Sequence, residues 1–311
     1  MGLALLIKGG DWFVDGATGA ARRFGLSELL IGATVVSIGT TLPEVMVSAS
    51  SALTGHGEIA YGNAIGSVIC NTALIAALST AIRPGRVDPK SLRLPVTFFF
   101  ASAVLYAGLA YGRGAFTRLD GLVLLGLFLA YMVCTVLQMK SGAQRAGARP
   151  AEEVPSTGRC VLLLAAGALL IAVGADLLVD NGTLIAQALG VPESVIALTF
   201  VALGTSLPEL VTAITSLVKG HSSLMLGNII GANLFNLVLV SGVSIALAPF
   251  TLPQEASIGG HNASLVLDIP VMFGVMLLLT LPAVLRGKTS RLQGCLLLAA
   301  YGAFCFVQFT I

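Results

Sequence analysis

Two six-residue segments combine a proline, hydroxyl side chains and a carboxylate within apolar sequence. They are residues 39–44 (GTTLPE) and residues 204–209 (GTSLPE). A proline inside a helix leaves the carbonyl four residues earlier without a donor, and bends or breaks the helix. Such a break brings together freed carbonyls, hydroxyls and a carboxylate, which are the hard oxygen ligands suited to calcium and sodium. The paired motifs therefore predict a cation site.

The composition places these motifs in a membrane. Of the 311 residues, 56% are hydrophobic and only 10% are charged, and the mean hydropathy is +0.94. Soluble domains carry about 25% charged residues. Apolar stretches approaching the roughly 20 residues that span a bilayer recur along the chain, which predicts an all-α membrane protein. We expect no cleavable signal peptide, because the first apolar stretch contains Lys8 and Asp11.

The chain matches itself at a fixed offset of 165 residues without a gap, so that Glu44 falls on Glu209 and Asn71 on Asn236. Five apolar helices are expected in each copy, and an odd number of crossings turns the second copy upside down relative to the first. We therefore predict ten transmembrane helices as two inverted five-helix repeats, with broken helices 2 and 7 at the centre. The predicted spans are residues 2–20, 25–52, 58–80, 92–112, 119–139, 160–186, 190–217, 223–247, 263–285 and 292–309.

The loops between these spans carry an asymmetric charge. The repeats are expected at residues 1–139 and 160–311, with a polar linker at residues 140–159. With the N-terminus outside, the outer loops hold only Arg113 and Arg118. The cytoplasmic loops then hold Arg22, Arg23, Arg83, Arg86, Lys90, Arg93, Lys140, Arg145, Arg149, Arg159, Lys219, Arg286, Lys288 and Arg291. By the positive-inside rule, we predict a multi-pass protein of the plasma (inner) membrane with both termini outside and the linker cytoplasmic.

The carboxylates of the motifs also have a structural interpretation. Thr41 and Glu44 fit a capping box, in which the proline opens a helix. A carboxylate in the middle of a membrane is costly, and this chain carries Glu44 and Glu209 at matched positions. We therefore expect cation binding at both, with capping as an additional role.

A second polar pattern follows each motif. Asn63, Ser67 and Asn71 recur every four residues and so share a helix face. We expect this face to line the cavity, with hydrogen bonding between helices as the alternative. Structural roles are expected for the other polar and glycine positions: packing for Gly62, Gly66, Gly227 and Gly231, hydrogen bonding for Asp11, Asp15, Asp176 and Asp180, capping for Glu28 and Glu193, and exposed turns for His56 and His221.

The paired segments GTTLPE…GNAIGSVICN and GTSLPE…GNIIGANLFN resemble the two alpha-repeats of the cation/calcium exchanger superfamily, in its prokaryotic sodium/calcium exchanger branch. The resemblance covers nearly the whole chain, with an alpha-1 motif at residues 37–71 and an alpha-2 motif at residues 202–236. It implies a secondary active antiporter that exchanges sodium for calcium by alternating access. Helices 1 and 6 would form a tilted pair that slides against the other eight helices.

The resemblance also implies partners and ligands. The partners are calcium and sodium ions and the lipid bilayer, with no nucleic acid, no cofactor, no enzymatic activity and a monomeric chain as the working expectation. Glu44 and Glu209 match the central calcium-coordinating glutamates, together with the carbonyls of Thr40 and Thr205. The other matched ligand positions are carbonyls for sodium at Ser37 and Ala202, hydroxyls at Thr41, Ser206 and Ser67, and central positions at Asn71 and Asn236.

Three features distinguish the chain from relatives. Ala232 stands where the family often has serine, so one sodium site loses a hydroxyl and the sodium count stays open. Asn236 stands where potassium-dependent relatives carry aspartate, which argues against potassium. Gly66 and Gly231 stand where proton-coupled relatives carry an acid, which favours sodium.

Other functions stay open on the sequence alone. A proton-coupled antiporter for calcium or another divalent cation would use the same fold. A cation channel would also suit broken helices with oxygen ligands, although the chain shows no pore-ring symmetry. A membrane enzyme is disfavoured, because no HExxH, GxSxG or P-loop pattern occurs.

Overall fold

The computed structural model describes residues 1–146, 155–188, 202–254, 256–308 and 310 of the chain. Helices dominate these residues, alongside a short hairpin of β1 (Ser257–Ile258) and β2 (His261–Asn262). Eight helical segments among them are long and apolar enough to cross a membrane, which confirms the all-α membrane class. These segments are Glu28–Leu53, Gly57–Ile82, Pro89–Arg113, Arg118–Met139, Thr157–Leu177, Ser222–Leu247, Ser264–Arg286 and Arg291–Gln308.

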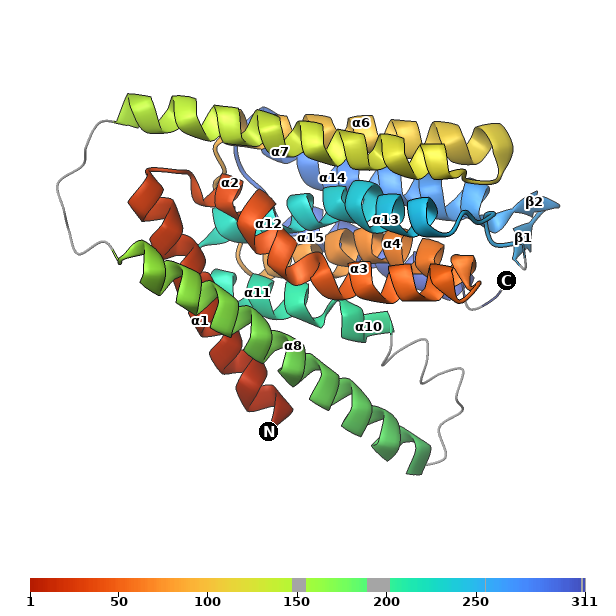
Figure 1. Cartoon of the computed structure of the whole chain (residues 1–311), viewed down its shortest axis with the longest axis horizontal. Coiled ribbons are helices and arrows are strands. Elements are labelled where there is room, and N and C mark those ends of the chain that lie inside the picture. The colour runs from red at the N-terminus through yellow and green to blue at the C-terminus, as the bar shows by residue number, and fades with distance from the viewer. Residues whose placement is uncertain (147–154, 189–201, 255, 309, 311) are drawn as a thin grey trace.

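Two long helices, α1 (Gly2–Phe24) and α8 (Thr157–Ala188), lie side by side and are inclined to the other helices (Figure 1). Glycines allow their backbones to approach closely. A Cβ added to Gly9 would lie 2.9 Å from the carbonyl oxygen of Gly167, and small residues permit such close packing between membrane helices. The expected tilted pair is therefore present.

The span that carries the first motif consists of α2 (Glu28–Ile31), the π-helical segment η1 (Gly32–Val36) and α3 (Ser37–Leu53). The break predicted at Pro43 is wrong, because α3 continues through this proline. A proline removes only one backbone bond, and membrane helices absorb it through neighbouring helices and local π adjustments. The wider turn of η1, just upstream, is such an adjustment.

The second motif does contain the predicted break. The short helix α10 (Ala202–Thr205) ends at a turn formed by Ser206, and α11 (Leu207–Val218) begins directly after it. Pro208 lies in the first turn of α11, where a missing N–H leaves no helical bond unmade. The upstream part of this predicted span, with Glu193, lies outside the described residues.

Two matched spans lie at the centre of the structure. The first is α4 (Gly57–Cys70), η2 (Asn71–Ala76) and α5 (Ala77–Ile82), and the second is α12 (Ser222–Phe235), η4 (Asn236–Val240) and α13 (Ser241–Leu247). Each π segment begins at one of the matched asparagines, Asn71 or Asn236. Because π turns are frequent at functional sites, these asparagines are strong candidates for a role in binding.

Four further segments complete the bundle: α6 (Pro89–Arg113), α7 (Arg118–Ala146), η5–α14 (Ser264–Asp268 and Ile269–Arg286) and α15 (Arg291–Gln308). The helices α6 and α7 lie along one edge (Figure 1). Buried aromatic rings pack these helices against α12; the ring centroids of Tyr131 on α7 and Phe235 on α12, for example, are 6.0 Å apart. Helix α7 continues to Ala146 and α8 begins at Thr157, so both helices enter the segment 140–159 that was expected to be a linker.

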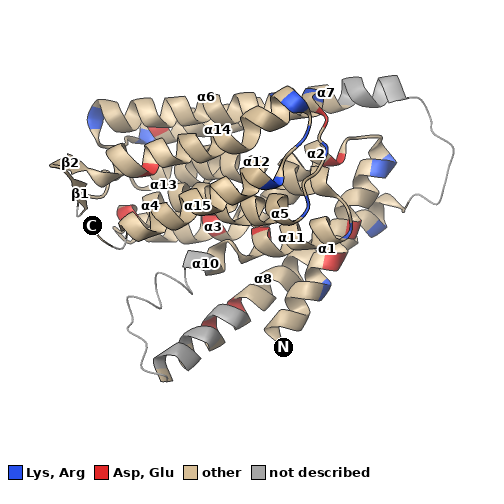
Figure 2. Cartoon of the chain, turned by 180° about the vertical axis from the view of Figure 1, so that it is seen from behind, with Lys and Arg blue, Asp and Glu red and all other residues tan. Residues whose placement is uncertain are grey.

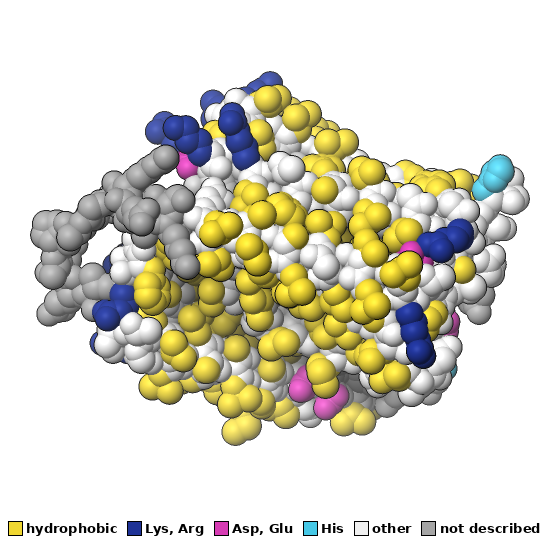
Figure 3. Space-filling model, turned by 45° about the horizontal axis from the view of Figure 1, so that its top comes forward, with side chains coloured by type: hydrophobic (Ala, Val, Ile, Leu, Met, Phe, Trp, Pro, Cys, Tyr) yellow, Lys and Arg dark blue, Asp and Glu magenta, His cyan; other side chains and the backbone are white. Residues whose placement is uncertain are grey.

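The distribution of side chains fits a bilayer. Hydrophobic side chains cover the middle of the face in Figure 3, and Lys and Arg side chains lie towards its ends. Figure 2 shows more basic residues at one end of the bundle than at the other. Loops from distant parts of the chain pair at each end: Val87 N donates to the Gly287 carbonyl, and Phe116 N donates to the Phe250 carbonyl, both at 2.9 Å.

A glycine substitution tests the packing of α2 against α12. A Cβ on Gly227 would lie 2.2 Å from the carbonyl oxygen of Leu29, so Gly227→Ala forces two helices apart. Overpacking of this kind costs about 1–3 kcal/mol. We expect Gly227→Ala to lower the thermal unfolding temperature of the purified protein. Gly108→Ala is the matched control, since no described atom lies within 4 Å of its added Cβ, and equal stability of the two variants would contradict this packing.

Candidate functional site

Two carboxylates lie fully buried between the matched motifs. Glu44 on α3 and Glu209 in the first turn of α11 are both 0% exposed. None of their carboxylate oxygens has a hydrogen-bond partner among the described residues, and the two groups are near enough to repel each other. Buried charges in proteins are paired or coordinate metals. This pair of carboxylates therefore calls for a cation.

Hydroxyl groups surround the carboxylates. The side chains of Thr40, Thr41 and Ser206 are buried, and the hydroxyl of Thr41 has no hydrogen-bond partner among the described residues. The expected capping role is wrong at Thr41, which lies within α3. In the second copy, Ser206 occupies the N-cap position of α11 with Pro208 and Glu209 in the first turn, although its side chain makes no cap bond. The Thr41 hydroxyl is thereby left available as an oxygen ligand.

Reciprocal hydrogen bonds join the two motifs to the two central spans. Thr40 Oγ1 donates to Asn228 Oδ1 at 3.3 Å. At the matched positions, Thr205 Oγ1 donates to Asn63 Oδ1, also at 3.3 Å. Asn63 Nδ2 in turn donates to the carbonyl oxygen of Glu44 at 3.2 Å. Asn63 thus makes the hydrogen bonds between helices that were the alternative expectation for the polar face, and the cavity-lining role of this face stays a prediction.

The remaining predicted positions lie around this centre. Asn71 and Asn236 are 0% exposed, and both polar atoms of each amide lack a hydrogen-bond partner in the described chain. Ser67 is buried on α4. Ser37 is buried where α3 meets α12, and its hydroxyl donates to the Asn228 carbonyl at 3.0 Å. Ala202 is the first residue of α10, and its side chain lies outside the described part of the structure.

Two buried hydroxyls were missed by the sequence patterns. Thr212 and Ser216 follow Glu209 on α11, are 0% exposed, and have hydroxyls without a hydrogen-bond partner among the described residues. Their spacing of three and seven residues from Glu209 places all three on one helix face. The repeat gave no signal at Thr212, because its matched residue is Val47.

The donor set limits the kind of cation. No group of three or more His, Cys, Asp or Glu side chains that could hold a metal ion occurs within the described ranges. The available donors are instead two carboxylates and several neutral oxygens. Zinc and softer metals favour imidazole and thiolate ligands, whereas calcium and other hard cations favour carboxylate, carbonyl and hydroxyl oxygens. The site therefore suits hard cations.

The α1–α8 pair covers the motifs from one side. A small cavity of about 10 Å³ lies between the pair and both motifs, and it is roughly large enough for one water molecule. Its lining residues include Phe13 of α1 and Ile171 of α8, opposite Thr40 and Pro208. Any displacement of the pair would therefore alter access to the site from this side.

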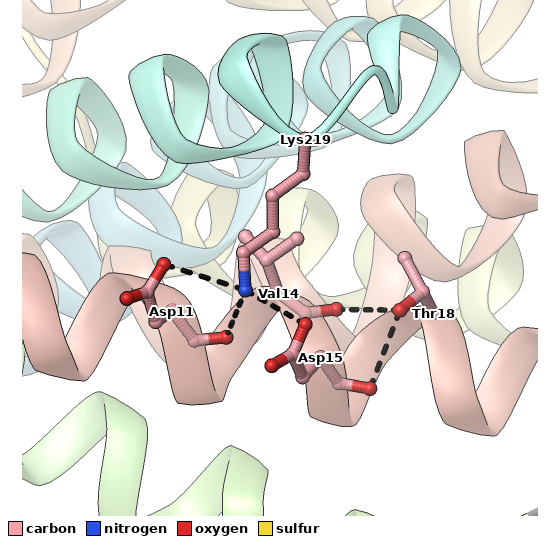
Figure 4. A network of polar contacts seen from close by, with 5 residues as sticks. All are labelled: Asp11, Val14, Asp15, Thr18 and Lys219. Atoms are coloured by element: carbon pink, nitrogen blue, oxygen red, sulfur yellow. Dashed lines mark hydrogen bonds and ion pairs between the residues drawn. The ribbon is translucent and has the colours of Figure 1, made fainter.

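An ionic contact fastens α1 to the end of α11 (Figure 4). Lys219 Nζ lies 2.7 Å from Asp15 Oδ1 and 3.3 Å from Asp11 Oδ1, and it donates to the Asp11 carbonyl oxygen at 3.0 Å. The structural hydrogen bonding expected for Asp11 and Asp15 is thereby confirmed. Asp176 and Asp180, their matched residues on α8, are exposed.

Two polar expectations near this contact need correction. The start of α2 is capped by Ser27, whose hydroxyl accepts a bond from Leu30 N, and not by Glu28. Serine is a better N-cap than glutamate because its short side chain reaches the free amides. Glu28 instead lies 2.9 Å from His221 Nδ1, so His221 is not a free surface histidine. His56 is exposed as expected.

Comparison with known proteins gives a consistent result. The family model for the sodium/calcium exchanger protein matches residues 1–137 and 160–310. An uncharacterized membrane protein of Methanocaldococcus jannaschii, MJ0091, is 37% identical over 97% of this chain and 93% of its own. The sodium/calcium exchanger MaX1 of Methanosarcina acetivorans is 29% identical over 100% of this chain and 97% of its own. A structure of the sodium-calcium exchanger NCX_Mj, soaked with sodium and strontium ions, superposes with a TM-score of 0.79 at 35% identity, covering 97% and 94% of the two chains.

Cation binding at the two carboxylates is testable by thermal stability. A ligand that binds only the folded protein stabilises it by about 2.7 kcal/mol at a hundred times its Kd, so calcium should raise the unfolding temperature. We expect Glu44→Gln and Glu209→Gln to lose this rise, since each removes one of the two negative charges. Glu58→Gln, at an exposed position on α4, should keep it. An unchanged calcium response in both site variants would place the cation elsewhere.

Proposed function

This chain belongs to the sodium/calcium exchanger protein family, and we propose that it is a secondary active antiporter that exchanges sodium for calcium by alternating access. The observation that carries the proposal is the pair of buried carboxylates, Glu44 and Glu209, which have no hydrogen-bond partner in the described structure. Two negative charges neutralise one calcium ion. Sodium ions that use the same carboxylates would exclude calcium, and this exclusion couples the two fluxes.

The proposed ligand set follows the two motifs. The carboxylates of Glu44 and Glu209 and the carbonyls of Thr40 and Thr205 bind calcium. Sodium uses oxygens of the same helices and of the flanking central spans. These oxygens belong to Ser37, Thr41, Ser67, Asn71, Ala202, Ser206 and Asn236. The burial of the described members and the free polar atoms of Thr41, Asn71 and Asn236 support this assignment.

We further propose ten transmembrane helices in two inverted repeats. The sequence offset of 165 residues supports this arrangement, as do the reciprocal bonds Thr40–Asn228 and Thr205–Asn63. The charge asymmetry supports a plasma-membrane orientation with both termini outside and the linker cytoplasmic. Loop pairing is consistent with it, since Val87 and Gly287 meet at the end assigned to the cytoplasm.

Alternating access would come from movement of the α1–α8 pair. The pair packs closely within itself through Gly9 and Gly167 and meets the motifs at a small cavity beside Pro208. A shift along the remaining helices would expose the site first to one side of the membrane and then to the other. Inverted repeats make the two exposed states structurally equivalent.

The flux itself is the decisive test of the exchange. Proteoliposomes loaded with sodium and placed in sodium-free medium should take up radioactive calcium, because sodium leaving down its gradient drives calcium inward. Glu44→Gln and Glu209→Gln should each abolish this uptake, because one carboxylate cannot balance a calcium ion, and Glu58→Gln should retain it. Calcium uptake that survives both site substitutions would refute the site.

The same vesicles separate the other functions. Uptake driven by a pH gradient in place of the sodium gradient would assign the chain to a proton-coupled antiporter. Uptake that needs no counter-ion would assign it to a channel. Sodium-driven uptake that is insensitive to a pH gradient is the result that the proposal predicts.

The contact between Lys219 and α1 should influence the balance of access states. Lys219→Thr, which introduces the residue found at the matched position Thr54, removes the ion pairs to Asp11 and Asp15. Partly exposed pairs contribute about 0.2–1 kcal/mol each, so the loss of both should change the ratio of the apparent sodium affinities on the two sides of the membrane by up to roughly thirtyfold.

Lys288→Thr is the control for this substitution. Lys288 lies at the same predicted side of the membrane, in the loop that pairs with Arg86, and no ion pair joins it to α1 among the described residues. The Lys288→Thr substitution should leave the ratio of the two apparent sodium affinities unchanged. Identical ratios for the wild type and Lys219→Thr would show that this contact does not restrain α1.

A further inference from the structure

The two repeats place their serines differently at two pairs of matched positions. Position 37 is serine, and its matched position 202 is alanine. Position 67 is serine, and its matched position 232 is alanine. The contact between α3 and α12 therefore holds Ser37 and Ala232. In the other half of the repeat, the matched positions are Ala202, the first residue of α10, and Ser67 on α4.

The position of the Ser37 hydroxyl relates it directly to Ala232. Ser37 Oγ lies 3.0 Å from the Asn228 carbonyl oxygen, to which it can donate. A Cβ added to Gly231 would lie 2.3 Å from Ser37 Oγ. Asn228 lies four residues before Ala232, so in a regular helix its carbonyl points along α12 towards the backbone of Ala232. The hydroxyl of Ser37 thus lies against the turn of α12 that leads into Ala232.

A serine at position 232 would direct its own hydroxyl to this carbonyl. Serine hydroxyls within helices commonly bond to the carbonyl four residues earlier, which for position 232 is the Asn228 carbonyl. Ser37 makes that bond from the neighbouring helix instead. At these matched positions each half of the repeat therefore keeps one serine, on α3 in one half and on α4 in the other.

We propose that Ser37 Oγ is a sodium ligand that supplies from α3 the hydroxyl that Ala232 removes from α12. This inference rests on the proposed exchange and changes the role expected of Ser37, which was binding through its carbonyl. The Ser37 hydroxyl has one proton for three neighbouring acceptors, which are the Gly32 carbonyl and the carbonyl and side-chain oxygens of Asn228. Its lone pairs therefore remain for a cation, and Ser37 is 0% exposed. Thr40 shares the Asn228 side chain with Ser37 and lies beside the Glu209 carboxyl.

The hydroxyl of Ser37 also has a structural contact. It lies 2.8 Å from the Gly32 carbonyl oxygen, five residues earlier, at the start of the π segment η1. Ser241 makes the same contact with Asn236 after η4, at 3.0 Å. A loss of function in Ser37→Ala alone would therefore not distinguish an ion ligand from a residue that closes the π turn.

A transplanted hydroxyl makes the distinction. Sodium-driven calcium uptake would be measured against sodium concentration for the wild type, Ser37→Ala, the double variant Ser37→Ala/Ala232→Ser, and Ser241→Ala. Calcium–calcium exchange in the absence of sodium would be measured in parallel. We expect Ser37→Ala to raise the half-saturating sodium concentration at least fivefold and to lower the Hill coefficient, with calcium–calcium exchange within twofold of the wild type.

The double variant decides the proposal. Returning the hydroxyl to α12 should restore the sodium dependence to within twofold of the wild type, although the bond to Gly32 stays absent, and Ser241→Ala should resemble the wild type. The proposal is overturned if Ser37→Ala keeps the wild-type sodium dependence, if the double variant stays as impaired as Ser37→Ala, or if calcium–calcium exchange falls equally. A wild-type protein without any sodium-driven uptake would instead refute the exchange on which the inference rests.

Discussion

Two carboxylates without hydrogen-bond partners, buried inside a membrane protein, are the constraint on which the rest of the structure depends. Removing a charge from water costs several kcal/mol even after the protein relaxes, and Glu44 and Glu209 repel each other as well. A cation bound between the two carboxylates balances both charges and removes this repulsion. A carrier that changes its access state quickly with cations bound and slowly with an empty site exchanges one ion for the other, without net flow of either ion alone. The coupling of the two fluxes thus follows from electrostatics, with no chemical step.

The surrounding elements keep this arrangement in place. The π segments η1, η2 and η4 offset the helices beside the site, and two of them begin at Asn71 and Asn236. Close backbone contact at Gly227 brings α12 against α2. The asparagines that bond across the motifs hold the hydroxyls of Thr40 and Thr205 in equivalent positions. The α1–α8 pair meets this core at the Lys219 ion pairs and at the small cavity beside Pro208, and it is the part that we propose moves.

The sequence predicted the membrane class and the positions of the spans that the structure describes because apolar length is a local signal. The asparagine face was recognised from its period of four residues. The π segments and the continuous path of α3 through Pro43 could not be predicted, since they depend on how neighbouring helices satisfy freed backbone groups. The start of α6 was placed three residues late, although Asp88 and Pro89 form a recognisable N-terminus in which the Asp88 carboxylate accepts from the amides of Lys90 and Ser91. The ion pair of Lys219 with α1 joins residues more than 200 positions apart and had no sequence signal.

Equilibrium binding of radioactive calcium to the purified protein, titrated with sodium, tests the central claim most directly. If Glu44 and Glu209 serve both ions, the protein binds a single calcium ion, and sodium displaces it completely. The apparent calcium affinity would then fall with a constant slope on logarithmic axes, and the slope would report how many sodium ions compete. Calcium that stays bound at saturating sodium, with both ions present on one protein, would contradict mutual exclusion at a shared pair of carboxylates.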